Sequence, residues 1–350
     1  MDNISYGLIG VSRLLLDEDD DNEFQGFSEK EYKSLSEESQ EGAESRLSDA
    51  ILHNIHLVQK IIVKCGEIGI RHYRIPNSFL CVNFLDKKLQ EFNNSDEIIK
   101  GIRNIGALSR SRSVTVSIHA DPLNSLVGSD NVVESSIKEL EFYGEVFKIM
   151  GLSKNIANPI VLTLPPPTDF EETTEFIDEF YSSFKRLDKN TESRIVISNC
   201  NKGFWNCINL FKFAHVYMWE RYNKLIPLTF NLKNDILNPS EINDGQIETE
   251  VNVGAFHATW NGVVPVFTWT ELNEDLKPKD TLYKSIPDFG NFIKWECDVK
   301  DKDIAIFELL HPDEERKITD DDLNQAVTSA YSSAKQNYSE YSKFNMLYNR

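Results

Sequence analysis

Several short apolar segments of the chain end in a polar residue of a type that can bind a metal ion or form hydrogen bonds. The segments and their last residues are 114–119 with His119, 160–163 with Thr163, 194–198 with Ser198, 227–231 with Asn231, 265–268 with Thr268, and 304–308 with Glu308. In a closed barrel of parallel strands, the residues that do chemistry lie at the carboxyl ends of the strands. Those ends would offer one imidazole and one carboxylate here, because the other residues carry neutral hydroxyl and amide groups.

The elements that position these residues alternate between strand and helix. Apolar residues recur at helical spacing from Ile51 to Cys65, and amphipathic helices are expected at about 132–150 and 170–184, each ahead of a short apolar strand. Roughly eight such units in one chain predict an α/β fold of the (β/α)8 TIM-barrel type. We expect residues 1–350 to form a single barrel domain with a C-terminal helix over 319–348.

Composition limits the class of protein. The chain has 350 residues, of which 40% are hydrophobic and 11% aromatic, so that it can bury a large core. It contains no run of about 18 apolar residues, and its first residues lack the features of a signal peptide. The five cysteines are scattered without a CxxC pair, which argues against a disulfide framework or a zinc knuckle. We expect a soluble intracellular protein, cytoplasmic or nuclear, with no membrane association.

Charge is the second strong feature of the sequence. The formal net charge of −19 disfavours general nucleic-acid binding, because contacts to phosphates need clustered Lys and Arg. Residues 17–45 hold 12 Asp and Glu against two lysines, a net charge of −10. This stretch is also rich in Ser, so we predict an exposed loop or disordered insertion, with an acidic docking or regulatory segment as the alternative.

Five segments, in order and at matching spacing, carry motifs of a known family. They are 69–75 (GIRHYRI), 117–122 (SIHADP), 136–143 with 150–152 (SIKELEFY and MGL), 194–199 (RIVISN), and 258–260 with 265–270 (ATW and PVFTWT). In these segments the chain resembles the UV damage endonuclease (UVDE) family. Each motif alone is weak, but five motifs in register argue against a chance match.

The resemblance implies a TIM barrel that binds a cluster of divalent metal ions, commonly manganese, and nicks DNA 5′ of lesions. Carried over residue by residue, the family's ligands are kept at His119 and, unless a shift of one residue places Phe307 there, at Glu308. The other ligand positions fall on neutral residues, namely Thr163, Ser198, Asn231, Asn234 and Thr268. His119 and Glu308 cannot hold two metal ions, so we expect them to form a hydrogen-bonded buried pair, with a residual metal site at these two residues as the alternative.

The part of the family site that reads lesions is also altered. Where the family presents a Gln and an aromatic residue to fill the gap left by flipped nucleotides, this chain has Pro122 and Leu123. Neither side chain can reproduce that hydrogen bonding and stacking. The resemblance implies metal-dependent cleavage and recognition of the lesion, and the residues for both are therefore altered in this chain.

We interpret the chain as a catalytically degenerate UVDE-like barrel, a pseudoenzyme without cofactor that acts as a binding or structural subunit with a protein partner. One alternative is a manganese-dependent DNA repair endonuclease with a rearranged site, which would need new ligands near strand ends, such as Asp121, Asp235 or Glu271. The other alternative is a nucleic-acid-binding module that does not cleave. Fold alone does not decide between these functions.

Overall fold

The computed structural model describes residues 4–81, 88–167, 172–242, 245–282, 286–287 and 289–312. Within these residues, eight parallel strands form one sheet in the order β6-β5-β4-β3-β2-β1-β10-β9. The strands are β1 (Ile4–Ile9), β2 (His72–Ile75), β3 (Thr115–His119), β4 (Ile160–Thr163), β5 (Ile195–Ser198), β6 (Leu228–Thr229), β9 (Val266–Trp269) and β10 (Ile293–Cys297). A parallel bridge between Asn231 and Thr268 joins the two ends of this order. The sheet closes on itself, and the predicted (β/α)8 class is confirmed.

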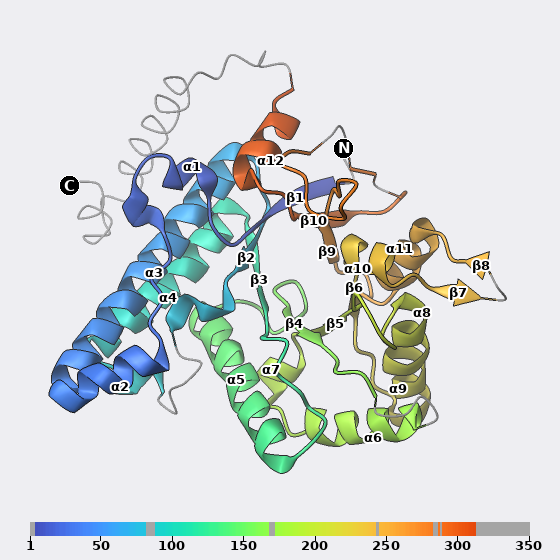
Figure 1. Ribbon diagram of the computed structural model, residues 1–350, viewed down its shortest axis with the longest axis horizontal. Helices are drawn as coiled ribbons and strands as arrows, with labels where there is room; N and C mark the ends of the chain where they lie inside the picture. Colours follow the sequence, from blue (N-terminus) through green and yellow to red (C-terminus); the bar gives the residue numbers. More distant parts are fainter. Residues whose placement is uncertain are drawn as a thin grey trace.

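Helices follow the strands and lie around the outside of the barrel (Figure 1). They are α1 (Arg13–Leu16), α2 (Glu29–Glu38), α3 (Gln40–Ile68), α4 (Ser95–Arg112), α5 (Asp130–Ile149), α6 (Thr173–Phe184), α7 (Lys189–Glu192), α8 (Cys207–Asn209), α9 (Met218–Tyr222), α10 (Leu232–Leu237), α11 (Thr249–Ala258) and α12 (Lys302–Leu310), with a π-helix at Leu210–Tyr217 between α8 and α9. A small antiparallel hairpin, β7 (Glu241–Ile242) and β8 (Gly245–Gln246), lies between α10 and α11. Among the described helices, none is long and apolar enough to cross a membrane.

The barrel interior carries charged and hydroxyl groups on β2, β3, β9 and β10, whereas the larger apolar core lies between the strands and the helices. Alternate residues of a strand point to opposite faces. On β10, the ring of Trp295 packs against Phe267 of β9, with ring centroids 5.7 Å apart. The flanking Lys294 and Glu296 instead reach Thr115 and Ser117 of β3, which lies across the barrel and not beside β10. The inward positions therefore carry charged and hydroxyl groups, which matters for the site.

The sequence-based assignment of the last barrel strand was wrong. Residues 304–308 lie in α12 and not in a strand, and β10 at Ile293–Cys297 takes that place in the barrel. A short apolar run does not distinguish strand from buried helix, and here Ala305 and Ile306 are buried as part of a helical turn. The strand β1, which we did not predict, pairs with both β10 and β2.

The acidic stretch 17–45 is not the predicted loop. It contains α2 and the start of α3, and α2 begins with a capping box in which the Ser28 hydroxyl and the Glu31 side chain each bond the other residue's backbone N–H. An ion pair between Lys33 and Glu29 adds a contact one turn apart. The capping box and the ion pair one turn apart favour a helix here, despite an acidic and Ser-rich composition that is typical of loops. α2 buries none of its residues, so this helix is exposed, as we predicted for the stretch.

The described C-terminal part of the chain is anchored through Asp303 of α12. Its buried carboxylate accepts hydrogen bonds from the Ser12 hydroxyl and from the backbone N–H groups of Arg13 and Leu14, at the start of α1. This contact joins the last described helix to the segment after β1. The helix predicted over 319–348 lies outside the described residues.

Candidate functional site

The strand register brings most of the predicted site positions together at the carboxyl end of the barrel. Thr163 pairs with Ser198, and Asn231 with Thr268, as neighbours on adjacent strands. His119 is the last residue of β3. These positions line one end of the barrel, which we call the barrel mouth. The structure thus places His119, Thr163, Ser198, Asn231 and Thr268 in one ring.

The two asparagines among the predicted site positions, Asn231 in the ring and Asn234 on α10, have structural roles. The Asn231 side chain caps α10 by accepting a hydrogen bond from the Asn234 backbone N–H at 3.1 Å. The Asn234 side chain donates to the Asn199 carbonyl at 2.6 Å, and the Asn199 side chain accepts from the Asn231 N–H at 2.7 Å. These bonds tie β5 to α10 and leave the amides engaged with backbone rather than turned to a ligand.

Glu308 does not belong to the barrel mouth. It is exposed on α12, and the expected pair with His119 does not form. The glutamate that does face His119 is Glu296 of β10, with His119 Nε2 3.5 Å from its Oε2. The prediction of a buried His–Glu pair therefore named the wrong glutamate, because the last strand was assigned to residues 304–308.

Glu296 is the centre of the site. Its side chain is 1% exposed. Donors from three strands surround the carboxylate: His72 Nε2 at 3.1 Å and Ser117 Oγ at 2.8 Å from Oε1, and Arg74 Nε at 3.0 Å and Thr268 Oγ1 at 3.1 Å from Oε2, with a second Arg74 nitrogen also bonded to Oε2. Two carboxylate oxygens offer about four lone-pair positions in total. The hydrogen-bonding capacity of Glu296 is therefore filled.

The electrostatics of the site follow from burial and from Arg74. Burial alone would raise the pKa of Glu296, but the Arg74 guanidinium together with His119 and His72 outweighs burial, and the pKa lies well below the ordinary value. Burial, together with the positive charge of Arg74, lowers the pKa of His119 to about 4. Burial also lowers the pKa of His72. At neutral pH the site consequently contains one carboxylate, one guanidinium and two neutral imidazoles.

The residues present do not fit the metal cluster that the resemblance implies. A cluster of divalent ions needs several anionic or imidazole ligands with free lone pairs. In the described ranges, no three His, Cys, Asp or Glu side chains are arranged to hold a metal ion. The Glu296 carboxylate, which faces His119, is already bonded to the Arg74 guanidinium.

The residues considered as replacement ligands do not converge either. Asp235 is buried and bonded to Thr249 at 3.0 Å and Asn252 at 2.9 Å. Glu271 forms an ion pair with Lys279. Asp121 accepts from the Leu123 N–H in a turn. Each carboxylate therefore serves a structural contact, Asp235 between α10 and α11 and the other two within their own loops.

The turn after β3 presents its most apolar residue to solvent. The Asn124 N–H donates to the Asp121 carbonyl at 2.9 Å, which closes a tight turn with Pro122 and Leu123 at its centre. The Leu123 side chain is 86% exposed, the largest value among the exposed large apolar residues. This turn leaves the barrel at the mouth because it follows the carboxyl end of β3.

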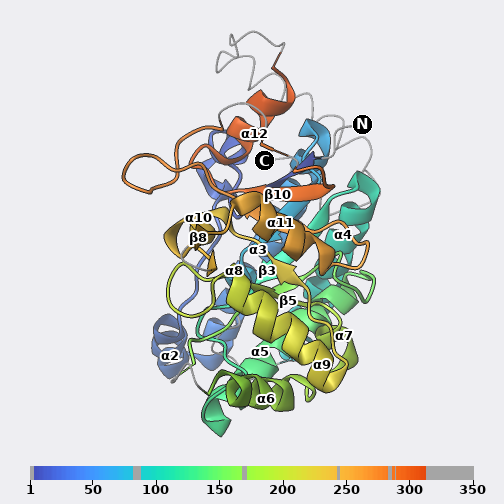
Figure 2. The same ribbon diagram turned by 90° about the vertical axis from the view of Figure 1, so that its right-hand side faces the viewer.

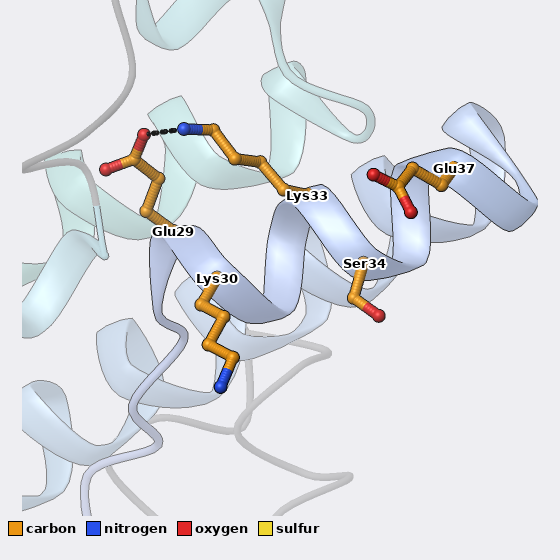
Figure 3. Close-up of a pocket in the computed structure, with 5 residues that line it drawn as sticks. All are labelled: Glu29, Lys30, Lys33, Ser34 and Glu37. Atoms are coloured by element: carbon orange, nitrogen blue, oxygen red, sulfur yellow. Dashed lines mark ion pairs between the residues drawn. The ribbon is translucent and has the colours of Figure 1, made fainter.

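A shallow hollow on α2 is not a competing site. Glu29, Lys30, Lys33, Ser34 and Glu37 line it, and all five come from one exposed helix (Figure 3). The only ion pair drawn there, between Lys33 and Glu29, joins residues one turn apart on that helix. Such a hollow lacks side chains from a second element that could enclose a ligand. The barrel mouth is therefore the better candidate for a functional site.

Sequence reasoning missed the residues that neutralise the site. Arg74 and Glu296 are 222 positions apart, and neither stood out as a ligand candidate. A usable signal was present in the alternation Lys294-Trp295-Glu296, in which polar and aromatic residues alternate as in a strand with one polar face. This alternation is typical of a surface strand whose polar face meets solvent. In this barrel the polar face of β10 points into the interior instead.

Comparison with known proteins gives a consistent family assignment. A family model described as UV-endonuclease UvdE matches residues 4–330. The UV DNA damage endonuclease of Nostoc sp. is 21% identical over 272 residues, which cover 76% of this chain and 79% of that protein. The UV-damage endonuclease of Schizosaccharomyces pombe is 21% identical over 160 residues, which cover 45% of this chain and 25% of that protein.

A solved structure supports the fold. The crystal structure of SacUVDE superimposes with a TM-score of 0.69 at 18% identity and covers 89% of this chain and 98% of that chain. At this level of identity the likeness establishes the barrel and its topology. The chemistry of the mouth has to be judged from the residues of this chain.

We predict that Glu296→Gln destabilises the protein by about 3–5 kcal/mol at pH 7, because it leaves the Arg74 charge without its partner. Adding Arg74→Gln should recover part of the loss. The folded pKa of Glu296 is lowered, so its contribution is present at neutral pH and is lost as the pH falls below the unfolded-state value of about 4.3. Urea unfolding at pH 7 and at lower pH measures both effects. Glu308→Gln is the control, and an equal loss there would contradict the assignment.

Proposed function

Since the chain belongs to the UV-endonuclease UvdE family, we propose that it is a catalytically degenerate member that keeps the barrel as a binding or structural subunit, in an assembly that handles nucleic acid. The observation that carries the proposal is the Arg74–Glu296 pair. The Arg74 guanidinium, bonded to the Glu296 carboxylate, satisfies within the protein the charge that a metal ion would otherwise neutralise. The neutral residues Thr163, Ser198 and Thr268 complete the ring.

Charge balance makes metal binding at this mouth unfavourable. Two divalent ions bring four positive charges, and among the described residues no three His, Cys, Asp or Glu side chains are grouped to hold and offset them. A metal ion at Glu296 would also lie within a few ångströms of the Arg74 guanidinium, where like charges repel. A hydroxyl or amide replaces neither the charge nor the donor strength of a lost carboxylate or imidazole.

We predict substoichiometric manganese and zinc in protein purified without chelator. His119 is the one family ligand that the chain keeps at the mouth, and a single imidazole binds these ions weakly. Inductively coupled plasma mass spectrometry measures the metal content per chain. Two or more ions per chain would refute the proposal and would favour the alternative of a metal-dependent nuclease.

Restoring the lost ligands should create a metal site if the barrel is as described. We predict that Thr163→His, Ser198→Glu, Asn231→Asp, Asn234→His and Thr268→His together raise manganese affinity by at least about tenfold, because the register brings these positions to one mouth. Isothermal titration calorimetry measures the affinity. Adding His119→Ala to this variant should lower the affinity again. A folded five-fold variant that binds manganese no better than the parent protein would show that the alignment is wrong.

A second candidate function is nucleic-acid binding without cleavage, and the exposure of Leu123 favours it. Apolar side chains such as Leu can wedge between bases when a protein binds DNA. Leu123 projects at 86% exposure from a closed turn at the mouth. The net charge of −19 acts against this function, so any binding should be weak and sensitive to salt.

We predict no cleavage of UV-irradiated duplex DNA in the presence of manganese, and dissociation constants in the weak, non-specific range of about 10⁻⁴–10⁻⁶ M. If Leu123 wedges into DNA, Leu123→Ala should weaken the binding, whereas Leu225→Ala, which changes an exposed leucine elsewhere, should not. Fluorescence anisotropy with labelled duplex at two salt concentrations measures this. Equal binding by both variants would exclude the wedge, and incision of the duplex would overturn the main proposal.

A further inference from the structure

One side of the barrel carries a long segment without positive charge. From residue 234 to residue 276 the sequence has no Lys or Arg and eight Asp or Glu, although the whole chain has 37 Lys and Arg. The segment includes α11, the hairpin of β7 and β8, and most of α10, which follow β6, and it continues into the loop after β9. These elements lie together at one edge of the molecule (Figure 1), and in Figure 2 α10 and α11 face the viewer.

Helix α11 is apolar on both of its sides. Its inner side buries Asn252, Val253 and Phe256. Its other side carries Val251, Gly254, Ala255 and Ala258, at the spacing of one helical stripe. Val251 is 58% exposed, and a Cβ atom built on Gly254 would meet no other atom within 4 Å. A surface helix normally turns polar residues outward, so an outer stripe of this kind is typical of a face that another element covers.

The neighbouring elements expose further apolar residues. Ile236 is 44% exposed and Leu237 37% exposed on α10, and Ile242 is 49% exposed on the hairpin. Asp235 holds α10 against α11 through its hydrogen bonds to Thr249 and Asn252, between which Val251 lies in the sequence. The hairpin is closed by the bond from the Ile247 N–H to the Ser240 carbonyl. Ile236, Leu237, Ile242 and Val251 thus lie on α10, the hairpin and α11, which follow one another in the chain. We call the exposed surface of these elements the acidic–apolar face.

Carboxylates surround the apolar residues of this face. Glu241, Glu248 and Glu250 are exposed and lie next to Ile242 and Val251 in the sequence. No lysine or arginine of the segment offsets their charge. Exposed apolar residues scattered singly need no explanation, but a cluster rimmed by charge of one sign indicates an interaction surface. The negative charge of these glutamates favours a partner that carries positive charge.

We propose that the acidic–apolar face is a docking site for a cationic amphipathic segment of a partner protein, such as a helix with apolar residues on one side and Lys or Arg on the other. The apolar side would cover Val251 and Ile242, and the positive charges would meet Glu241, Glu248 and Glu250. Nucleic acid is a poor occupant because its phosphates would face these carboxylates. A second copy of this chain would bring the same negative charge. This inference goes beyond the proposed function and holds whether or not the mouth binds metal.

The test uses a fluorescent helical peptide built from Leu and Lys with one apolar and one cationic side, and anisotropy at physiological salt. We expect the peptide to bind, and a Leu–Glu peptide of the same pattern not to bind. Glu248→Lys with Glu250→Lys should weaken binding by about tenfold or more. The matched control, Glu37→Lys with Glu38→Lys on exposed α2, gives the same net charge and should change the affinity less than about twofold.

A second arm tests the apolar part of the contact. Val251→Gln should weaken binding of the Leu–Lys peptide, whereas Leu225→Gln, at an exposed leucine outside the face, should not. Hydrogen exchange should show protection concentrated in residues 236–258 when the peptide is bound. Equal losses from the two charge-reversal variants, no binding of the peptide, or tighter binding of duplex DNA to the same face would each overturn the proposal. The metal content of the protein does not enter this test, so it can fail or succeed separately from the proposed function.

Discussion

The buried charge of Glu296 is the constraint on which the interior of this barrel depends. An ionised carboxylate inside a protein costs several kcal/mol unless charge and hydrogen bonds compensate it. Here the compensation comes from three strands, with Arg74 and His72 on β2, Ser117 on β3 and Thr268 on β9. The register makes this possible, because Glu296 is paired with Thr268 and Arg74 with Ser117.

A polar interior moves the apolar core to the outside of the strands. Phe230, Phe267 and Trp295 lie in one aromatic cluster, with ring centroids about 6 Å apart, and Phe256 of α11 packs against Phe230. The barrel is therefore held by contacts between strands and helices, whereas its interior is fixed by hydrogen bonds. Substitutions at the mouth should therefore change the free energy of unfolding through lost charge compensation more than through lost packing.

The sequence predicted the barrel and most of the mouth, because both depend on local patterns repeated along the chain. Strands that end at His119, Thr163 and Ser198 have outward apolar residues in short runs, and their positions were correct. β10 was missed because its inward residues are Lys294 and Glu296, and the next apolar run, at 304–307, was taken in its place. The Arg74–Glu296 pair could not be predicted, since it joins residues that only the closed barrel brings together. The helix at 29–38 was missed because composition was given more weight than capping.

The neutralised mouth and the acidic–apolar face have one electrostatic consequence in common. In this chain Arg74 is bonded to Glu296, so the pair contributes no net charge to the surroundings. The field of Glu241, Glu248 and Glu250 therefore reaches solvent with little compensation from the barrel, and it falls off over about 8–10 Å at physiological salt. A molecule that approaches this side meets negative charge and exposed apolar groups together, so a partner must bring positive charge and apolar surface of its own.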